Sequence, residues 1–292
     1  MIIYVNLKSA FESLHSLSSS IRLTISFPPS AFWLLPFLIP FLSLMLFFGA
    51  ISHAEQNHAI EEKISVVNNC PQINDADIET GKELIILIHG FFRTPRNMSV
   101  LKDFFISRGF RVFTPRLPTT FGSLEECTEE FERQFRKLQG DYSRIHFVGH
   151  SMGGLILRQF LSRNKVRNIG RCVLIGTPNK GTNLASMISW CWPLRKIVKP
   201  IDALQSGGVD IPPPLNSPPP DMGAIAGNGD GLFFGTFIHG ENDGRVPVDS
   251  VSFKGMKELI LLGYHHNEIH RKHDVAELVY RFLREGTFGK EQ

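Results

Sequence analysis

The sequence predicts an α/β fold in which a mainly parallel central sheet carries helices on both faces. Short apolar runs alternate along the chain with longer segments whose apolar residues recur at helical spacing, and this alternation indicates right-handed βαβ units. The apolar runs are continuous, as is typical of strands that are covered on both faces. In sheets of this kind, ligands bind beyond the carboxyl ends of the strands.

An N-terminal hydrophobic segment, residues 1–54, is predicted to precede the folded domain. No Asp, Glu, Lys or Arg occurs from Leu23 to Ala54, and the centre of this stretch is long enough to cross a hydrocarbon core of about 30 Å as a helix. Two interpretations stay open: a signal peptide cleaved after Ala54, and an uncleaved membrane anchor. Basic residues precede the stretch and acidic residues follow it, so we expect a membrane-anchored or exported protein whose folded domain lies on the non-cytoplasmic side.

The folded domain is expected over residues 81–292, after a polar stretch at 55–80 that we interpret as a linker. Its first strand is ELIILIHG. The next segment, NMSVLKDFFISRG, predicts a helix that begins at the capping residue Asn97 and ends at Gly109. A second strand, FRVFTPRLP, follows this helix.

The next helix is predicted from a capping box. In SLEECTEEFERQFRKLQG, Ser123 precedes Glu126 by three residues, and the helix is expected to end at Gly140. After it come the strand RIHFVGH, the helix MGGLILRQFLSR and the strand RCVLIGTP. Two later apolar runs, in IAGNGD and FIHGEND, each predict a strand followed by Gly, two residues and Asp. The chain closes with a strand over LILL and an amphipathic helix ending in RFL.

The strand-to-helix turn VGHSMGG contains the pattern G-x-S-x-G, formed by Gly149, Ser151 and Gly153. Small residues on both sides of the serine let the chain reverse sharply, so its hydroxyl should stand above the sheet edge at the start of a helix. The amide of Met152 would then point to where an oxyanion forms, and we expect the second amide from Phe91, in the loop HGFF after the first strand. The alternative is a serine that only caps the helix.

These segments resemble the α/β-hydrolase family, and more closely its lipase and esterase branch, over residues 82–286. LIHGF resembles the oxyanion loop, GHSMGG the nucleophile elbow, and GTPNKGT a segment that often leads into a substrate-covering region. The resemblance implies a serine hydrolase that cleaves carboxylic esters through an acyl-enzyme and needs no cofactor. A thioesterase, amidase or acyltransferase would use the same residues. A catalytically inactive, membrane-tethered binding module is the alternative from another class.

A nucleophilic serine needs a base and an orienting acid, and the family's chain order of serine, acid and histidine directs the search for them. Asp243 and Asp230 compete for the acid. We favour Asp243, because its continuation NDGRVP resembles the family's acid loop, and Asp249 is a weaker third candidate.

His266 is the favoured base, because it lies where the family's histidine usually sits, between the last strand and the closing helix. His265 replaces it if the loop is shifted by one residue. We interpret His270 and His273 as solvated residues at the helix start.

Residues 182–221 form a candidate lid. An apolar and aromatic stretch with helical spacing is followed here by a Pro-rich connection, and lid opening would control access to the serine. An ordinary packing helix with an ordered loop is an equal alternative. With Phe91 and Phe92 expected at the pocket mouth, we favour an apolar acyl group, from a small-molecule or lipid ester, over a charged substrate.

Composition and charge argue against other kinds of ligand. The 292 residues carry a net charge of only +3, with acids and bases interspersed, so no basic patch for nucleic acid is expected. The four cysteines show no metal-binding spacing, and the four histidines at positions 265–273 lack complementary ligands. We therefore predict no metal site.

Overall fold

The structure is a computed structural model, and the residues that it describes are 82–138, 140–182, 199, 201–205, 207–229 and 238–289. The predicted signal peptide or anchor, the linker and Asp230 lie outside these residues. So does most of the candidate lid, since residues 183–198 are among those not described. These features of the sequence stay predictions.

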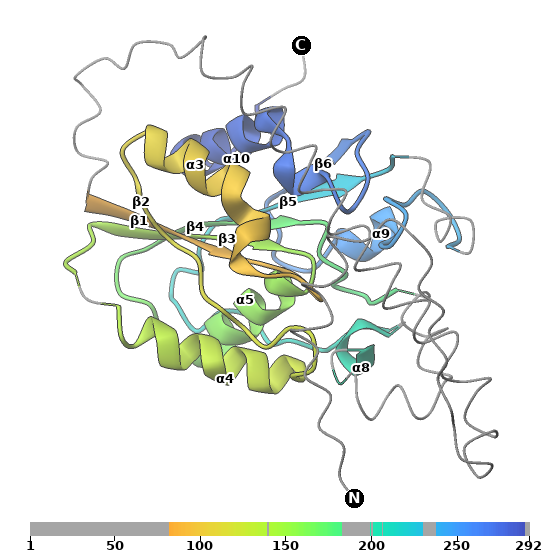
Figure 1. The fold of residues 1–292 in the computed structure, drawn as a ribbon, viewed down its shortest axis with the longest axis horizontal. Coiled ribbons are helices and arrows are strands. Elements are labelled where there is room, and N and C mark those ends of the chain that lie inside the picture. Colours follow the sequence, from red (N-terminus) through yellow and green to blue (C-terminus); the bar gives the residue numbers. More distant parts are fainter. Residues whose placement is uncertain are drawn as a thin grey trace, which may run out of the picture. The chain divides into compact units, whose positions relative to one another are not determined.

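In the described residues, six parallel strands form one sheet with the order β2-β1-β3-β4-β5-β6 (Figure 1). The strands are β1 (Glu83–Ile88), β2 (Arg111–Phe113), β3 (Arg144–His150), β4 (Ile169–Ile175), β5 (Met222–Gly227) and β6 (Glu258–Leu262). This arrangement confirms the predicted α/β fold with its parallel sheet.

The apolar run that predicts a strand before FIHGEND lies mostly outside the described residues, since residues 230–237 are not described, so that strand stays a prediction. Residues 238–243 form bends, and only an isolated bridge joins Asn242 to Pro247. In the loop that follows, Oδ1 of Asp243 accepts hydrogen bonds from the amides of Arg245 (3.0 Å) and Val246 (2.8 Å), a local side-chain contact of the kind that stabilises turns. The loop is therefore folded around its aspartate.

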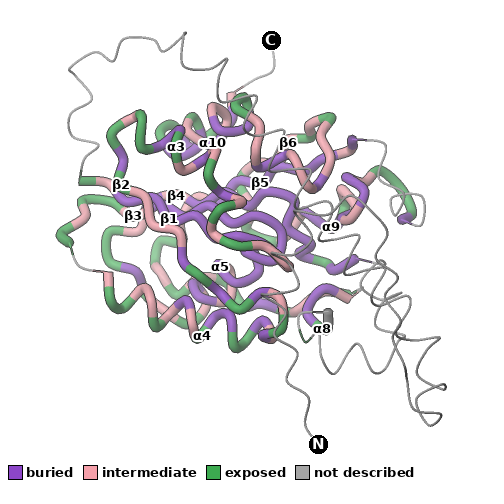
Figure 2. Tube along the Cα trace, viewed as in Figure 1, coloured by how far each residue is buried: buried purple, intermediate pink, exposed green. Residues whose placement is uncertain are grey.

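Helices cover both faces of the sheet because successive residues of each buried strand point to opposite sides. Along β1, residues 84, 86 and 88 join the core that includes α4 (Leu124–Phe135) and α5 (Met152–Arg163). Residues 85 and 87 join the core that includes α3 (Ser99–Ser107) and α10 (His273–Glu285). The strands in the middle of the sheet are accordingly buried (Figure 2).

Two helix boundaries differ from the prediction. Asn97 does not begin a helix, because a 3-10 turn at Pro95–Met98 precedes α3, and the side chain of Asn97 accepts a hydrogen bond from the amide of Thr94. Proline is well suited to this first position, since it has no amide hydrogen to satisfy. The helix α4 ends at Phe135, before Gly140, because its last turn tightens into hydrogen bonds between residues three apart.

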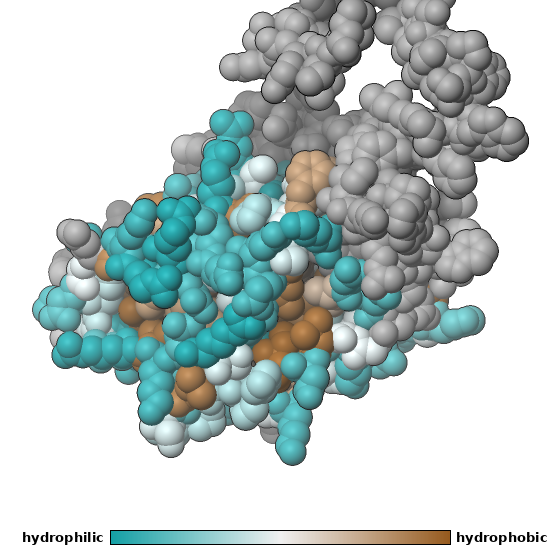
Figure 3. All heavy atoms as spheres, turned by 90° about the horizontal axis from the view of Figure 1, so that it is seen from below, coloured by the Kyte–Doolittle hydropathy of each residue, from teal (hydrophilic) through white to brown (hydrophobic). Residues whose placement is uncertain are grey.

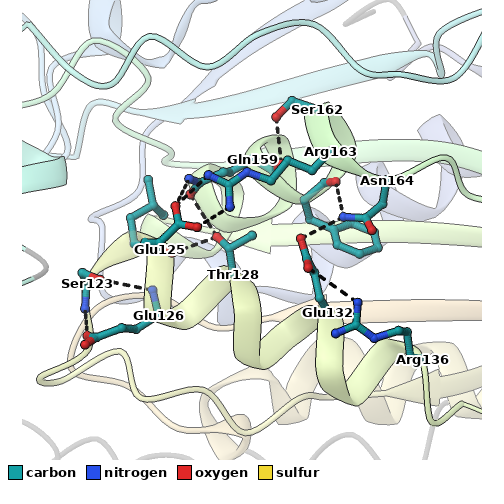
Figure 4. Close-up of polar contacts among 12 residues, drawn as sticks. Ser123, Glu125, Glu126, Thr128, Glu132, Arg136, Gln159, Ser162, Arg163 and Asn164 are labelled. Carbon is teal, nitrogen blue, oxygen red and sulfur yellow. Dashed lines mark hydrogen bonds and ion pairs between the residues drawn. The ribbon is translucent and has the colours of Figure 1, made fainter.

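The predicted capping box of α4 is present. Ser123 accepts a hydrogen bond from the amide of Glu126, whose carboxylate accepts one from the amide of Ser123 (Figure 4). The same view shows polar contacts that join α4 to α5, including those of Glu125 with Gln159 and Arg163. Exposed pairs of this kind contribute little to stability, so the buried rings of Phe131 and Phe160, 4.7 Å apart, dominate this packing.

Shorter elements complete the fold. The helices α8 (Ile201–Leu204) and α9 (Val248–Val251) and the 3-10 turn Ile269–Arg271 lie in connections between the main elements. The Pro-rich connection is attached to α5, because the amide of Leu215 donates to the carbonyl of Leu161 and Arg158 contacts the carbonyl of Ile211. These contacts hold the end of the candidate lid region against α5. The lid itself stays a prediction.

The surface seen from the side of α4 is mainly hydrophilic, with some hydrophobic residues exposed between the polar ones (Figure 3). Among the described residues, no helix combines the length and the apolar character that crossing a membrane requires.

Gly153 allows a close contact between α5 and β1, and its replacement tests that contact. A Cβ atom at this position would lie 2.3 Å from the carbonyl oxygen of Ile88. We expect Gly153→Ala to lower the free energy of unfolding by about 1–3 kcal/mol, as measured by urea denaturation. The matched control is Gly263→Ala, which adds its methyl group to open space and should change stability by less than about 0.5 kcal/mol. Equal losses in both variants would contradict this packing argument.

Candidate active site

Ser151 occupies the sharp turn between β3 and α5. Its φ of 56° and ψ of −129° place it in a region that residues other than glycine rarely adopt, at a cost of about 1–3 kcal/mol. Two hydrogen bonds hold this conformation: the amide of Ser151 donates to the carbonyl of Ile175 (2.8 Å), and its own carbonyl accepts from the amide of Gly154 (2.9 Å). Ser151 is 8% exposed, and because it directly follows the last residue of β3, it lies at the carboxyl edge of the sheet.

The loop after β1 lies directly against this turn. A Cβ atom at Gly90 would meet the Cβ atom of Ser151 at 2.8 Å, so only glycine permits this approach. The loop is also tied to the neighbouring connection, since the amide of Phe92 donates to the carbonyl of Thr119. The next residue after Gly90 is Phe91, which the sequence analysis singled out for its amide.

A chain of hydrogen bonds joins Ser151, His266 and Asp243. The distance from Oγ of Ser151 to Nε2 of His266 is 3.0 Å, and the distance from Nδ1 of His266 to Oδ2 of Asp243 is 2.7 Å. A carboxylate can only accept, so Nδ1 of His266 carries the proton and Nε2 is free to accept from the serine hydroxyl. The structure thus brings together the serine, the favoured acid and the favoured histidine.

Asp243 is 1% exposed, and its two carboxylate oxygens have different partners. Oδ2 faces His266, while Oδ1 accepts the amides of Arg245 and Val246. Burial of a carboxylate without such donors would be costly, so these three contacts are what the buried position requires. The backbone strengthens the pairing, because the amide of His266 donates to the carbonyl of Asp243 (2.9 Å).

Met152 is the first residue of α5. The first amides of a helix have no acceptor within the helix, and the helix dipole favours negative charge at this end. The amide of Met152 is therefore next to Ser151 in the chain, and the loop containing Phe91 contacts the same serine through Gly90.

The other candidates for the acid and the base that the structure describes make different contacts or are exposed. Nδ1 of His265 donates to the carbonyl of Gly229 (2.9 Å). Asp249 is exposed in the first turn of α9, and Asp230 is outside the described residues.

The interpretation of His270 as a solvated residue is wrong. The 3-10 turn Ile269–Arg271 directs this side chain inward, and its ring is fully buried. It stacks on His150, with 3.8 Å between the ring centroids. His273 is exposed at the first position of α10, as expected.

Several residues that contact the site were not singled out from the sequence. A Cβ atom at Gly176, whose φ is +53°, would lie 3.2 Å from Nδ1 of His266. Arg93 donates to the side chain of Asn267 (2.8 Å) and so joins the loop after β1 to the loop that carries His266. In the sequence, only the polar residue His150 at the end of a buried strand indicated that further polar side chains would contact the site.

No group of three or more His, Cys, Asp or Glu side chains in the part of the chain that the structure describes is arranged to hold a metal ion. His150 and His270 stack through their ring faces, whereas metal binding requires nitrogen atoms that converge on one point.

Comparison with known proteins relates this chain to hydrolases. The profile described as "Alpha/beta hydrolase family" matches residues 85–256, a range that includes Ser151 and Asp243. Triacylglycerol lipase 2 of Saccharomyces cerevisiae is 31% identical over 96 residues, which are 30% of this chain and 29% of that protein. The chain therefore aligns with less than a third of that relative's length.

Solved structures share the fold at low sequence identity. The mature form of the Bacillus licheniformis lipase BlEst2 has a TM-score of 0.54 and 17% identity, covering 75% of this chain and 96% of that one. A metagenomic carboxyl esterase has a TM-score of 0.53 and 14% identity, covering 69% of each chain.

Three buried histidines should make stability depend on pH. Burial lowers the pKa of His89 to about 4 and lowers the pKa of His150 and His270 well below the ordinary value. In the unfolded chain the pKa of each of these histidines is about 6.5. As the pH falls from 7 to 5, the unfolded chain therefore binds protons that the folded chain does not. The free energy of unfolding should fall between pH 7 and pH 5, by up to about 1.4 kcal/mol per histidine and pH unit.

Urea denaturation at pH 7, 6 and 5 measures this effect. His270→Phe should make the dependence on pH shallower, because one buried imidazole is removed. A matched replacement of the exposed His273, His273→Gln, should leave the dependence as it is. A free energy that stays constant from pH 7 to pH 5 in the parent would contradict the neutral, buried state of these rings.

Proposed function

Because the chain belongs to the alpha/beta hydrolase family, we propose that it is a serine ester hydrolase of the lipase and esterase type. Ser151 is the nucleophile, His266 the base and Asp243 the orienting acid. The observation that carries the proposal is the continuous hydrogen-bond chain from Oγ of Ser151 to the buried carboxylate of Asp243. A serine has little nucleophilic character without such a base.

The geometry supports acyl transfer to water in two steps. Oγ of Ser151 attacks the ester carbonyl carbon while Nε2 of His266 takes its proton, and the same proton then passes to the departing alcohol. Water, deprotonated by His266, attacks the acyl-enzyme and releases the carboxylic acid and free Ser151. The amides of Phe91 and Met152 stabilise the oxyanion in both steps.

Apolar acyl groups are the proposed substrates. The loop after β1 presents two aromatic rings, Phe91 and Phe92, packed edge to face with 5.2 Å between their centroids. Both residues are partly exposed and directly follow Gly90, which contacts Ser151. Apolar surfaces of this kind bind hydrocarbon better than charge. The same residues would act on thioesters or transfer an acyl group to another alcohol, so substrate tests have to include these reactions.

We also propose that the protein is exported or anchored to a membrane through residues 1–54. The support is the uncharged stretch from Leu23 to Ala54, which is long enough for either role. Fractionation of cells that produce the full chain, followed by determination of the mature N-terminus, distinguishes cleavage after Ala54 from retention.

Hydrolysis of p-nitrophenyl esters from acetate to palmitate tests the proposed activity. Ser151→Ala and His266→Ala should each lower kcat by roughly four orders of magnitude or more, because serine and histidine act as a unit. The chain-length optimum separates an esterase from a lipase, and thioester analogues test the related reaction. A parent protein that hydrolyses no ester and does not react with a fluorophosphonate at Ser151, yet binds lipid or protein, would instead be a binding module.

Asp243→Asn tests the acid. An asparagine keeps the shape but no longer stabilises the protonated His266 or selects its tautomer, so kcat should fall roughly 10⁴-fold. Asp249→Asn is the matched control, since this carboxylate is exposed, and its kcat should stay within about twofold. If Asp230→Asn abolished activity while Asp243→Asn retained it, the assignment of the acid would be overturned.

A further inference from the structure

The main chain of His266 is held from both sides. His266 lies in a turn between β6 and the 3-10 turn Ile269–Arg271, so regular secondary structure does not fix it. Instead, its amide donates to the carbonyl of Asp243 (2.9 Å), and its carbonyl lies 3.1 Å from Nε2 of His150. Together with the two ring contacts, these bonds give His266 four fixed polar groups.

His150 is the donor in its contact with His266. A carbonyl oxygen can only accept, so the proton of His150 is on Nε2. The imidazole is 2% exposed, and its Nδ1 has no hydrogen-bond partner among the described residues. The polar interaction of this ring with the described part of the protein is therefore directed at the main chain of His266.

His270 supports the ring of His150 from the other side. The two rings stack with 3.8 Å between centroids and 26° between planes, while the rings of His150 and His266 are 4.9 Å apart. His150 is also the last residue of β3, so its backbone is fixed by the sheet next to Ser151. One rigid strand end thus carries Ser151 and the donor that reaches the loop of His266.

We infer that His150 is a positioning residue, which holds the ring of His266 in reach of Ser151 by donating a hydrogen bond to the carbonyl of His266. This inference rests on the proposed function, in which His266 is the base. Rotation of the His266 peptide would swing the imidazole away from Oγ of Ser151, and a displacement of about 1 Å can lower a rate roughly 100-fold. His150 contacts no reacting atom in this role.

The competing explanation is that His150 only fills space in the core, and three variants separate the two. His150→Leu puts an apolar side chain of similar size in place of the imidazole and so removes the donor. His150→Gln supplies an amide N–H donor in place of the imidazole. His270→Phe keeps an aromatic ring against His150 and removes only the second imidazole. All are made in the full chain, purified in mild detergent.

The first measurement is kcat and KM for a p-nitrophenyl ester, per active site titrated with a fluorophosphonate. His150→Leu should lower kcat roughly 10- to 100-fold with KM changed less than about twofold, and His150→Gln should recover most of the loss. His270→Phe should stay near the parent. If His150→Leu lowers only the number of titratable sites or the thermal midpoint, with kcat per site unchanged, His150 is a filler and the inference is overturned.

A second measurement does not require activity. The proton on Nδ1 of His266, shared with Asp243, should give a low-field proton NMR signal, which His266→Ala identifies by removing it. This signal should be broadened or lost in His150→Leu and retained in His150→Gln. A signal unchanged in His150→Leu would overturn the inference. If the parent shows the signal but hydrolyses no ester, the proposed function fails while the effect of His150 on His266 is still measured.

Discussion

Ser151 can stand at the edge of the sheet only because three stretches of backbone approach one another there with no side chain between them. A Cβ atom would meet the neighbouring chain at less than 3 Å at Gly90, Gly149 and Gly153. These glycines let α5 start immediately after β3 and let the loop after β1 contact the serine. The positive φ of Ser151 is unfavourable for a residue other than glycine, and the surrounding packing offsets its cost.

The parallel sheet assembles the remainder of the site. Because the carboxyl ends of parallel strands lie at one edge, loops that are distant in sequence meet there. The loops that follow β5 and β6 supply Asp243 and His266, and the turn after β3 supplies Ser151. Arg93 and Asn267 join the loop after β1 to that of His266, so the two outer parts of the site are fixed to each other.

Burial raises the free-energy cost of any hydrogen bond that the polar groups of the site fail to make. A buried carboxylate is costly unless its hydrogen bonds are made, and both oxygens of Asp243 have partners. The same burial keeps His89, His150 and His270 neutral by lowering the pKa of each. Of these three rings, that of His150 lies beside the ring of His266, and that of His270 stacks on His150.

The sequence by itself determined the alternation of strands and helices, the boundaries of α5, the turn at Ser151 and the capping box of Ser123, because each depends on residues that are close along the chain. Only the tertiary structure decided which histidine contacts the serine, since His266 is 115 positions away from Ser151. It also decided that His270 is buried and that Asn97 lies inside a 3-10 turn. These outcomes depend on which loops the sheet brings together, and local spacing carries no information about contacts between distant strands.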